Sequence, residues 1–460
     1  MTNLRPEKQQ PGRQMPARFP YAVMGLSIAT ALAFLWLGTR LVPGSNLPEN
    51  ELRILSRAFA AIDEDYIFEL DDQGRRDLLH AAISGMVEDL DRYSHYYRPE
   101  DEEAYKRETH GVLTGIGIVV QTVEDKVLLL YPIPGGPAEA ADMMVGDILT
   151  AIDGKPVTAT GDAVELIKGP RGTHVRLTIR RGDAEQRVIA VQRKEVRIAS
   201  VKWARVLDAQ AGVGYIFLQK FTRSSVEELD AAITQLRSSL GKVELRGLVL
   251  DIRRNPGGLL STCLKLTNRF VKQGKLLTIQ PRNKPEEVHV ADPAVCLYPD
   301  MKLVLLIDHE SASASEVMAG ALQDHARARL VGTRSWGKGV VNEVYRWSDQ
   351  KVRLKLTTSY YVTPKGRKIE RHLRKSSDDE GGGILPDKIV ECADKKQRTA
   401  ILQQLYRREV PPIYRTQVAK LQDKFPGIQV LQPLPTKKDP QLDSALAELR
   451  LALQQVEKKK

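Results

Sequence analysis

The sequence predicts a multidomain α/β protein, with a β-rich region ahead of an α/β domain and helical segments at both ends. Strand-like and helix-like runs alternate from 212 to 363, a pattern typical of an α/β domain. Short alternating runs and glycine turns dominate 110–195, whereas helical patterns dominate 46–109 and the region after 395. A chain of 460 residues is long enough for two or three such domains.

Composition narrows the class of protein. The chain is 42% hydrophobic, which is ordinary for a globular protein, and has a formal net charge of +11. No nucleic-acid motif accompanies that charge, so we expect no nucleic-acid partner and take anionic lipid as the candidate partner of the basic surface. The three cysteines, Cys263, Cys296 and Cys392, lie in no metal or redox spacing. Cys263 is expected to be a buried thiol, with a Cys263–Cys296 disulfide as the alternative.

The N-terminal region predicts a membrane anchor. Residues 1–18 form a polar, basic tail, and residues 19–41 form a mostly apolar run of about the length that spans a bilayer. The basic flank predicts a cytoplasmic N-terminus, with the bulk of the chain in the periplasm or an equivalent extracytoplasmic space. The alternative is a cleaved signal peptide, although residues 41–45 make a poor cleavage site. We therefore expect a single-pass protein of the inner (cytoplasmic) membrane.

The stretch 302–341 carries the clearest candidate for chemistry. It predicts a buried strand at 302–308, a helix that begins near Ser311-Ala-Ser-Ala-Ser-Glu316, and a second strand at 328–332. Lys338 follows, between two glycines. A serine at the start of a helix lies beside free backbone N–H groups, which favour the negative charge of an alkoxide or an oxyanion. Such a serine still needs a base to take its proton.

Three side chains are candidates for that base. His325 lies 12 residues after Ser313 on the same predicted helix. At a rise of about 1.5 Å per residue it is roughly 18 Å away, which is too far for a hydrogen bond. His309 is close in sequence and stays a candidate. Lys338 is the third, because a lysine becomes a base at neutral pH when burial lowers its pKa; a solvated loop lysine is the alternative.

At these residues the chain resembles a known family, the carboxy-terminal processing proteases, which are PDZ-containing serine peptidases with a Ser–Lys dyad. The resemblance rests on Ser311-Ala-Ser-Ala-Ser-Glu316, Ala321-Leu-Gln-Asp324 and Gly337-Lys-Gly339, and covers about residues 52 to 450. It implies that Ser313 is the nucleophile and Lys338 the general base. The family's lysine-orienting glutamine corresponds to Asn342, whose side chain is shorter by one methylene.

The resemblance also assigns two further sites. The motif Asn255-Pro-Gly-Gly258 implies an oxyanion hole formed by the N–H of Gly257 or Gly258 together with that of Ala314. The family commonly has a small or polar residue just before this motif, and this chain has the bulkier Arg254 there. The region 110–195 resembles a PDZ domain, whose glycine loop binds C-terminal carboxylates and whose edge pairs with the peptide as an added strand. The implied peptide-binding residues are Gly115, Ile116, Gly117 and Ile118.

These observations together predict a membrane-anchored serine endopeptidase. It would bind C-terminal tails through a PDZ domain and cleave with a Ser–Lys dyad through an acyl-enzyme, without metal or cofactor. The expected segments are a tail (1–18), an anchor (19–41), helices (46–109), a PDZ domain (110–195), a ClpP/crotonase-like α/β peptidase domain (196–395) and C-terminal helices (396–460). Expected partners are protein substrates with accessible C-terminal tails, the inner membrane, and a second copy or an adaptor lipoprotein. The alternative function is an anchored PDZ binding protein with an inactive peptidase domain.

Overall fold

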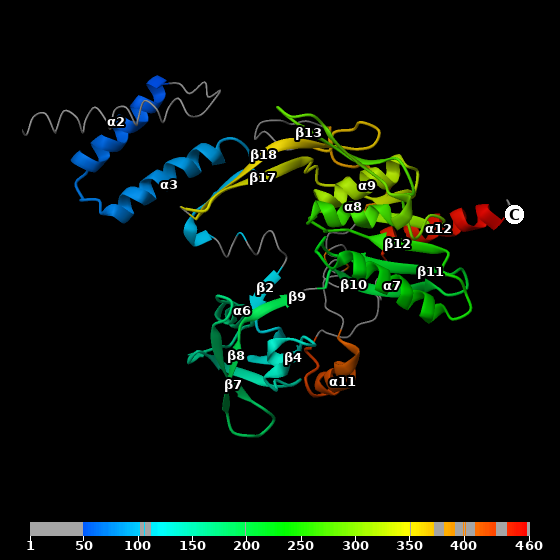
Figure 1. The fold of residues 1–460 in the computed structure, drawn as a ribbon. Coiled ribbons are helices and arrows are strands. Elements are labelled where there is room, and N and C mark those ends of the chain that lie inside the picture. Colours follow the sequence, from blue (N-terminus) through cyan, green and yellow to red (C-terminus); the bar gives the residue numbers. More distant parts are fainter. Residues whose placement is uncertain are drawn as a thin grey trace, which may run out of the picture. The chain divides into compact units, whose positions relative to one another are not determined.

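A computed structural model describes residues 49–101, 105, 112–197, 199–349, 351–371, 381–391, 399, 401, 410–428 and 439–457. The chain divides into two compact units, 1–79 and 80–460 (Figure 1). In the first unit, helix α2 (Glu49–Asp65) precedes the start of helix α3 (Asp72–Glu88). The Arg75 guanidinium pairs with the Asp63 carboxylate at 2.6 Å and links the two helices. Most of the α2 side chains, apolar ones included, are exposed.

A β-rich domain occupies the start of the second unit. Its main sheet has the order β3-β4-β5-β7-β8, with β6 paired to β5, so β3 lies at an edge. The strands are β3 (Ile118–Val123), β4 (Lys126–Pro132), β5 (Ile148–Ile152), β6 (Lys155–Pro156), β7 (His174–Arg180) and β8 (Arg187–Gln192). Strands β2 (Val112–Gly115) and β9 (Lys194–Arg197) pair separately, and the helices are α5 (Pro137–Ala140) and α6 (Thr160–Ile167). Burial alternates along β7, as the sequence predicts for a half-exposed strand.

A mostly parallel sheet forms the centre of the α/β domain, in the order β10-β11-β12-β15-β16-β19. Only β10 is antiparallel to its neighbour among these strands. The strands are β10 (Val201–Asp208), β11 (Val213–Leu218), β12 (Gly247–Asp251), β15 (Lys302–Ile307), β16 (Ala328–Gly332) and β19 (Lys388–Ile389). The short β11, β12 and β15 are apolar almost throughout, because both faces of a parallel sheet are covered.

Two hydrophobic cores lie on the two faces of this sheet. Leu248, Leu250 and Leu305 pack on the side of α7 (Ser225–Leu240), α8 (Leu260–Asn268) and α9 (Ala314–Asp324). The alternate residues Val249 and Val304 face α12 (Pro440–Glu457), whose Ala445, Leu449 and Leu453 are buried against them. The predicted C-terminal helical segment thus includes a helix that packs on the sheet of its own α/β domain.

A second sheet carries a long hairpin of β17 (Val340–Trp347) and β18 (Val352–Val362). The other edge of β18 pairs with β1 (His95–Tyr97) and β13 (Lys275–Pro281), and β13 pairs with β14 (Glu287–Val290). Helix α11 (Arg415–Lys424) packs with Phe425 and Ile428 on β4 of the β-rich domain. Three short 3₁₀ turns complete the described elements: η1 (Pro99–Asp101), η2 (Pro293–Val295) and η3 (Pro412–Tyr414).

Two predictions need correction or comment. Among the described residues no helix is both long and apolar enough to cross a bilayer, so the predicted single-pass membrane localisation is not upheld. The predicted tail and anchor lie outside the described residues. The alternative of a Cys263–Cys296 disulfide is wrong, since both thiols are free, and Cys263 is fully buried as predicted. Cys392 lies outside the described residues.

Candidate active site

Ser313 lies at the turn between β15 and α9, where it is the N-cap residue of the helix. Its φ of 57° and ψ of −116° fall outside the regions that non-glycine residues prefer. Such a conformation costs about 1–3 kcal/mol and persists only where the surroundings hold it. Here the Ser311 hydroxyl donates to the Ile252 carbonyl at 2.8 Å, and the Ala312 N–H donates to the Asn255 carbonyl at 3.0 Å. The turn therefore holds a half-buried serine at the helix terminus.

The carboxylate of Glu316 joins this turn to the loop that carries Lys338. It is fully buried and accepts four hydrogen bonds, from the backbone N–H of Ser313 (2.8 Å), Gly337 (2.6 Å) and Lys338 (2.7 Å) and from the Ser335 hydroxyl (2.5 Å). Burial raises the pKa of Glu316 to about 7, while the four bonds favour its charged form. Because Ser313 and Lys338 donate to the same oxygen, Oε2, their backbones are close neighbours.

Lys338 is half-buried, and its ammonium lies over the aromatic ring of Tyr93, with Nζ 4.9 Å from the ring centroid. The face of an aromatic ring stabilises a cation at this distance. Burial raises the pKa of Tyr93 to about 12, so its phenol is neutral at physiological pH. The N–H of the next residue, Gly339, donates to the Glu370 carboxylate at 2.8 Å. The lysine thus lies between a polar loop and a neutral ring.

Asn342, the predicted orienting residue, lies on β17 at a register shift. Its amide nitrogen donates to the Thr357 hydroxyl at 3.0 Å and makes a longer contact of 3.5 Å with the Tyr93 carbonyl. The Thr357 hydroxyl donates to Asp91 at 3.2 Å, and the same carboxylate accepts the Tyr93 N–H at 2.6 Å. Asn342 therefore helps to hold the segment that carries Tyr93, the residue whose ring faces Lys338.

The glycines of the Asn255-Pro-Gly-Gly258 loop lie against the serine turn. Gly257 has a φ of 99°, and a Cβ added there would lie 3.0 Å from both the Ser313 Cβ and the Ala314 nitrogen. Its own N–H donates to the Asn255 side chain at 2.9 Å. Within the described part of the chain, the N–H of Gly258 donates no hydrogen bond. The Ala314 N–H is the first of α9 and has no acceptor within the helix.

The two histidines that are close to Ser313 in sequence contact other groups. His325 is at the opposite end of α9, where its Nε2 is 2.6 Å from the Lys275 carbonyl oxygen. His309 follows β15 and faces Glu310, with Nε2 3.6 Å from that carboxylate. Of the three candidate bases, only Lys338 donates its backbone N–H to the carboxylate that also binds the backbone of Ser313.

The glycine loop of the β-rich domain leads from β2 into the edge strand β3. Ile116 is buried, and its carbonyl accepts the Ala138 N–H of α5 at 2.9 Å. Gly117 has a φ of 72°, which a side chain would strain, and its carbonyl accepts the Ile133 N–H at 2.8 Å. Ile118 begins β3, whose outer edge is unpaired within the described sheet. The predicted peptide-binding residues thus form one continuous turn beside an open strand edge.

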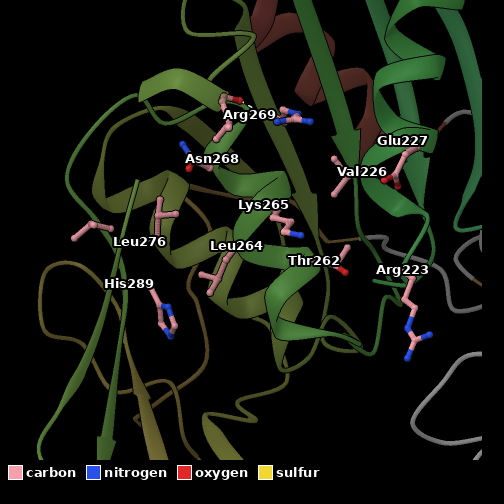
Figure 2. Close-up of a pocket in the computed structure, with 12 residues that line it drawn as sticks. Arg223, Val226, Glu227, Thr262, Leu264, Lys265, Asn268, Arg269, Leu276 and His289 are labelled. Carbon is pink, nitrogen blue, oxygen red and sulfur yellow. Dashed lines mark hydrogen bonds between the residues drawn. The ribbon is translucent and has the colours of Figure 1, made fainter. Parts of the chain in front are cut away.

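A separate cavity of about 410 Å³ lies among α7, α8 and the β13–β14 hairpin (Figure 2). Val226, Leu264 and Leu276 line it together with Lys265 and Arg269. None of the predicted catalytic or oxyanion-hole residues lines this cavity. This cavity is therefore separate from the candidate active site, which is the cluster around Ser313 and Lys338.

Sequence reasoning missed two members of this cluster, Glu316 and Tyr93. The role of Glu316 could have been predicted, because the Ser313-x-x-Glu316 spacing is that of a helix capping box, in which the glutamate accepts the N-cap N–H. Tyr93 gives no local signal. Its place beside Lys338 depends on the pairing of strands β1 and β18, which are far apart in the sequence.

Comparisons with known proteins give the family of the chain and two of its domains. Residues 212–390 match the model of peptidase family S41, and residues 130–181 match a PDZ domain. A carboxy-terminal-processing protease of Bartonella bacilliformis is 33% identical over 353 residues, which cover 75% of this chain and 77% of the relative. A probable CtpA-like serine protease of Staphylococcus aureus is 30% identical over 369 residues, 79% of this chain and 70% of the relative.

A solved structure of a photosystem II D1 C-terminal processing protease is 28% identical and covers 73% of this chain and 92% of that chain, with a TM-score of 0.43. The combination of a PDZ domain and an S41 peptidase domain is the one that the sequence predicts. The chain belongs to the carboxy-terminal-processing proteases of peptidase family S41, which are serine proteases.

Proposed function

We propose that this protease cleaves peptide bonds with a Ser313–Lys338 dyad. The observation that carries the proposal is that one buried carboxylate, that of Glu316, accepts the backbone N–H of both residues. One buried acceptor thereby holds the backbones of the proposed nucleophile and base beside each other. Preorganisation of this kind supports catalysis, because the reacting groups need no further ordering.

In the proposed mechanism, neutral Lys338 takes the proton of the Ser313 hydroxyl, and the serine oxygen attacks the carbonyl carbon of the substrate. The ammonium that results returns its proton to the leaving amine, and the peptide C–N bond breaks. Water then hydrolyses the acyl-enzyme, with Lys338 again as the base. The Tyr93 ring stabilises the ammonium between these steps, since a cation is favoured over a ring face.

The oxyanion of the tetrahedral intermediate would bind the N–H groups of Gly258 and Ala314. Gly258 is the better of the two predicted glycines, because the N–H of Gly257 already donates to the Asn255 side chain. The Cα of Gly257 packs directly on the serine turn, which holds the following peptide bond near Ala314. Each well-placed donor of this kind contributes about 3–4 kcal/mol to transition-state stabilisation.

The PDZ domain would select substrates by their C-terminal tails. An extended tail can pair with the open edge of β3 while its carboxylate binds at the Gly115–Gly117 turn. Replacing Ile118 with arginine should raise KM at least about tenfold for a protein with an apolar tail and leave cleavage of a short peptide unchanged. Val188→Arg, on the exposed part of β8, is the matched control.

Turnover of an unfolded protein with an apolar C-terminus tests the dyad. The full-length chain should cleave it, and both Ser313→Ala and Lys338→Ala should abolish cleavage while remaining folded. His309→Ala, which removes the competing base, should retain activity. Loss of activity in His309→Ala with retention in Lys338→Ala would move the base to the histidine. No cleavage by the wild type, with tail binding retained, would favour a binding protein.

A further inference from the structure

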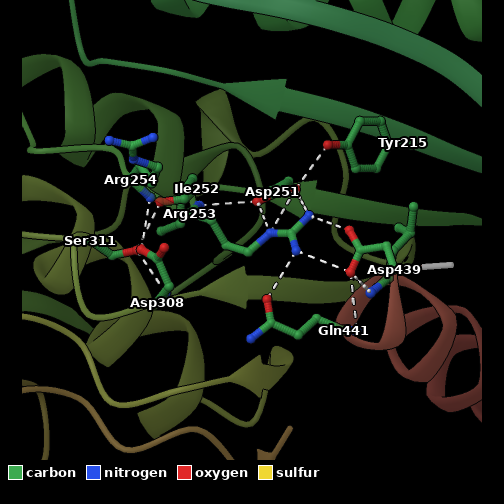
Figure 3. A network of polar contacts seen from close by, with 10 residues as sticks. Tyr215, Asp251, Ile252, Arg253, Arg254, Asp308, Ser311, Asp439 and Gln441 are labelled. Carbon is green, nitrogen blue, oxygen red and sulfur yellow. Dashed lines mark hydrogen bonds and ion pairs between the residues drawn. The ribbon is translucent and has the colours of Figure 1, made fainter. Parts of the chain in front are cut away.

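Arg253 is a buried arginine at the centre of a polar cluster (Figure 3). It lies just after β12 (Gly247–Asp251), and 2% of its side chain is exposed. Its guanidinium pairs with Asp251 at 2.6 Å and with Asp439 at 2.9 Å, and it donates to the Gln441 side-chain oxygen at 2.9 Å. The Tyr215 hydroxyl donates to Asp251 at 2.8 Å. One buried cation therefore lies between the carboxylate at the end of β12 and two side chains at the start of the C-terminal helix.

The same C-terminal groups also fix the start of α12. The Asp439 carboxylate accepts the N–H of Gln441 and of Leu442, both at 3.1 Å, and so caps the helix. The amide nitrogen of Gln441 donates to the Val390 carbonyl at 2.8 Å, just beyond β19. The first turn of α12 is thus held to the α/β domain at the point where Arg253 leaves β12.

The segment that follows Arg253 leads directly into the serine turn. The Arg254 N–H donates to the Asp308 carboxylate at 2.8 Å. The Asn255 carbonyl accepts the Ala312 N–H at 3.0 Å and the Ser315 hydroxyl at 2.8 Å. The loop that supplies the proposed oxyanion donor is therefore attached at one end to α12 and at the other to the nucleophile.

We propose that Asp439 and Gln441 are positioning residues of the peptidase reaction, which hold the oxyanion loop in place through Arg253. This inference rests on the proposed function. The start of the C-terminal helix then supports the active site, although it lies more than a hundred residues after Ser313 in the sequence. Loosening Arg253 shifts the loop, and a misplacement of about 1 Å at a catalytic donor costs about a hundredfold in rate.

A positioning role can be separated from simple stabilisation, because α12 has a second polar anchor. The Glu448 carboxylate pairs with Arg329 at 2.9 Å and with Lys388 at 3.0 Å, both on strands of the same sheet. This anchor holds the helix without contacting Arg253 or the loop. Glu448→Gln therefore weakens the attachment of α12 and leaves the proposed linkage intact.

The experiment compares the full-length wild type with Asp439→Asn, Gln441→Met and the control Glu448→Gln. For each protein, kcat and KM are measured on a short fluorogenic peptide, and the midpoint of thermal unfolding is measured in the same buffer. We expect kcat of Asp439→Asn and Gln441→Met to fall about ten- to a hundredfold, with KM within about twofold, at a temperature where both are folded. Glu448→Gln should keep kcat within about twofold of the wild type, even if its unfolding midpoint falls as far as those of Asp439→Asn and Gln441→Met.

Three results would overturn the inference. Wild-type kcat in both folded variants would show that the loop needs no support from α12. An equal loss of kcat in Glu448→Gln would show that the effect is one of helix docking alone. A wild-type protein that cleaves nothing would refute the proposed function itself, and the positioning role with it. An active wild type with unimpaired variants refutes only the positioning role.

Discussion

Replacing Glu316 with glutamine removes a buried charge, keeps the shape of the side chain, and changes how stability depends on pH. Burial raises the pKa of Glu316 from 4.5 to about 7. Between these values the folded protein holds a proton that the unfolded chain releases, so the free energy of unfolding falls as the pH rises. Since one pKa unit corresponds to about 1.4 kcal/mol, the wild type loses about 3 kcal/mol over this range because of Glu316.

Urea unfolding of the full-length wild type and Glu316→Gln, from about pH 4.5 to 8, measures this loss. Exposed carboxylates whose pKa is lowered by arginine partners, such as Asp142, titrate equally in both proteins and cancel in the difference. The two proteins should have similar stability at the acid end, and the variant should be more stable by about 3 kcal/mol at the alkaline end. Parallel pH profiles would refute the reasoning, because the carboxylate would then ionise alike in the folded and unfolded chains.

Three further changes test other contacts of the site. Gly257→Ala places a Cβ 2.8 Å from the Ala312 carbonyl, so peptide turnover should fall at least about a hundredfold, and a loss below about tenfold would contradict this. Tyr93→Leu removes the ring face that stabilises the lysine ammonium, so the acid limb of the kcat/KM profile should move to lower pH, whereas an unmoved limb would exclude the contact from catalysis. Arg253→Met leaves two buried carboxylates unpaired and should lower the free energy of unfolding by about 3–5 kcal/mol in urea, and a loss below about 1 kcal/mol would contradict the burial argument.

The local architecture of the active site follows from patterns within a few residues. The apolar run at 302–308 predicts a buried strand, and the small hydroxyl residues after it predict a helix start; the structure has β15 (Lys302–Ile307) and α9 (Ala314–Asp324) at these places. Periodicity predicts such elements because it depends on the burial of one segment at a time. It carries no information about which distant segment approaches the serine.

Contacts between distant segments account for what the sequence could not predict. Tyr93 reaches Lys338 only because β1 pairs with the first half of β18. Arg253 meets Asp439 only because α12 packs on the face of the sheet opposite α9. For the pairing of Ser313 with Lys338, residue spacing left several bases open, and only the family resemblance selected the lysine. The sequence thus predicts the secondary-structure elements, whereas the contacts between their side chains depend on the tertiary fold.

The most direct test of the proposed dyad is the mass of the covalent intermediate. The full-length wild type is mixed with an activated ester of a short peptide, quenched in acid, and digested for mass spectrometry. We predict an acyl group on the peptide that contains Ser313, absent from Ser313→Ala and at least about a hundredfold slower to form in Lys338→Ala. An acyl group on another residue, or one that forms at the wild-type rate without Lys338, would contradict the proposed mechanism.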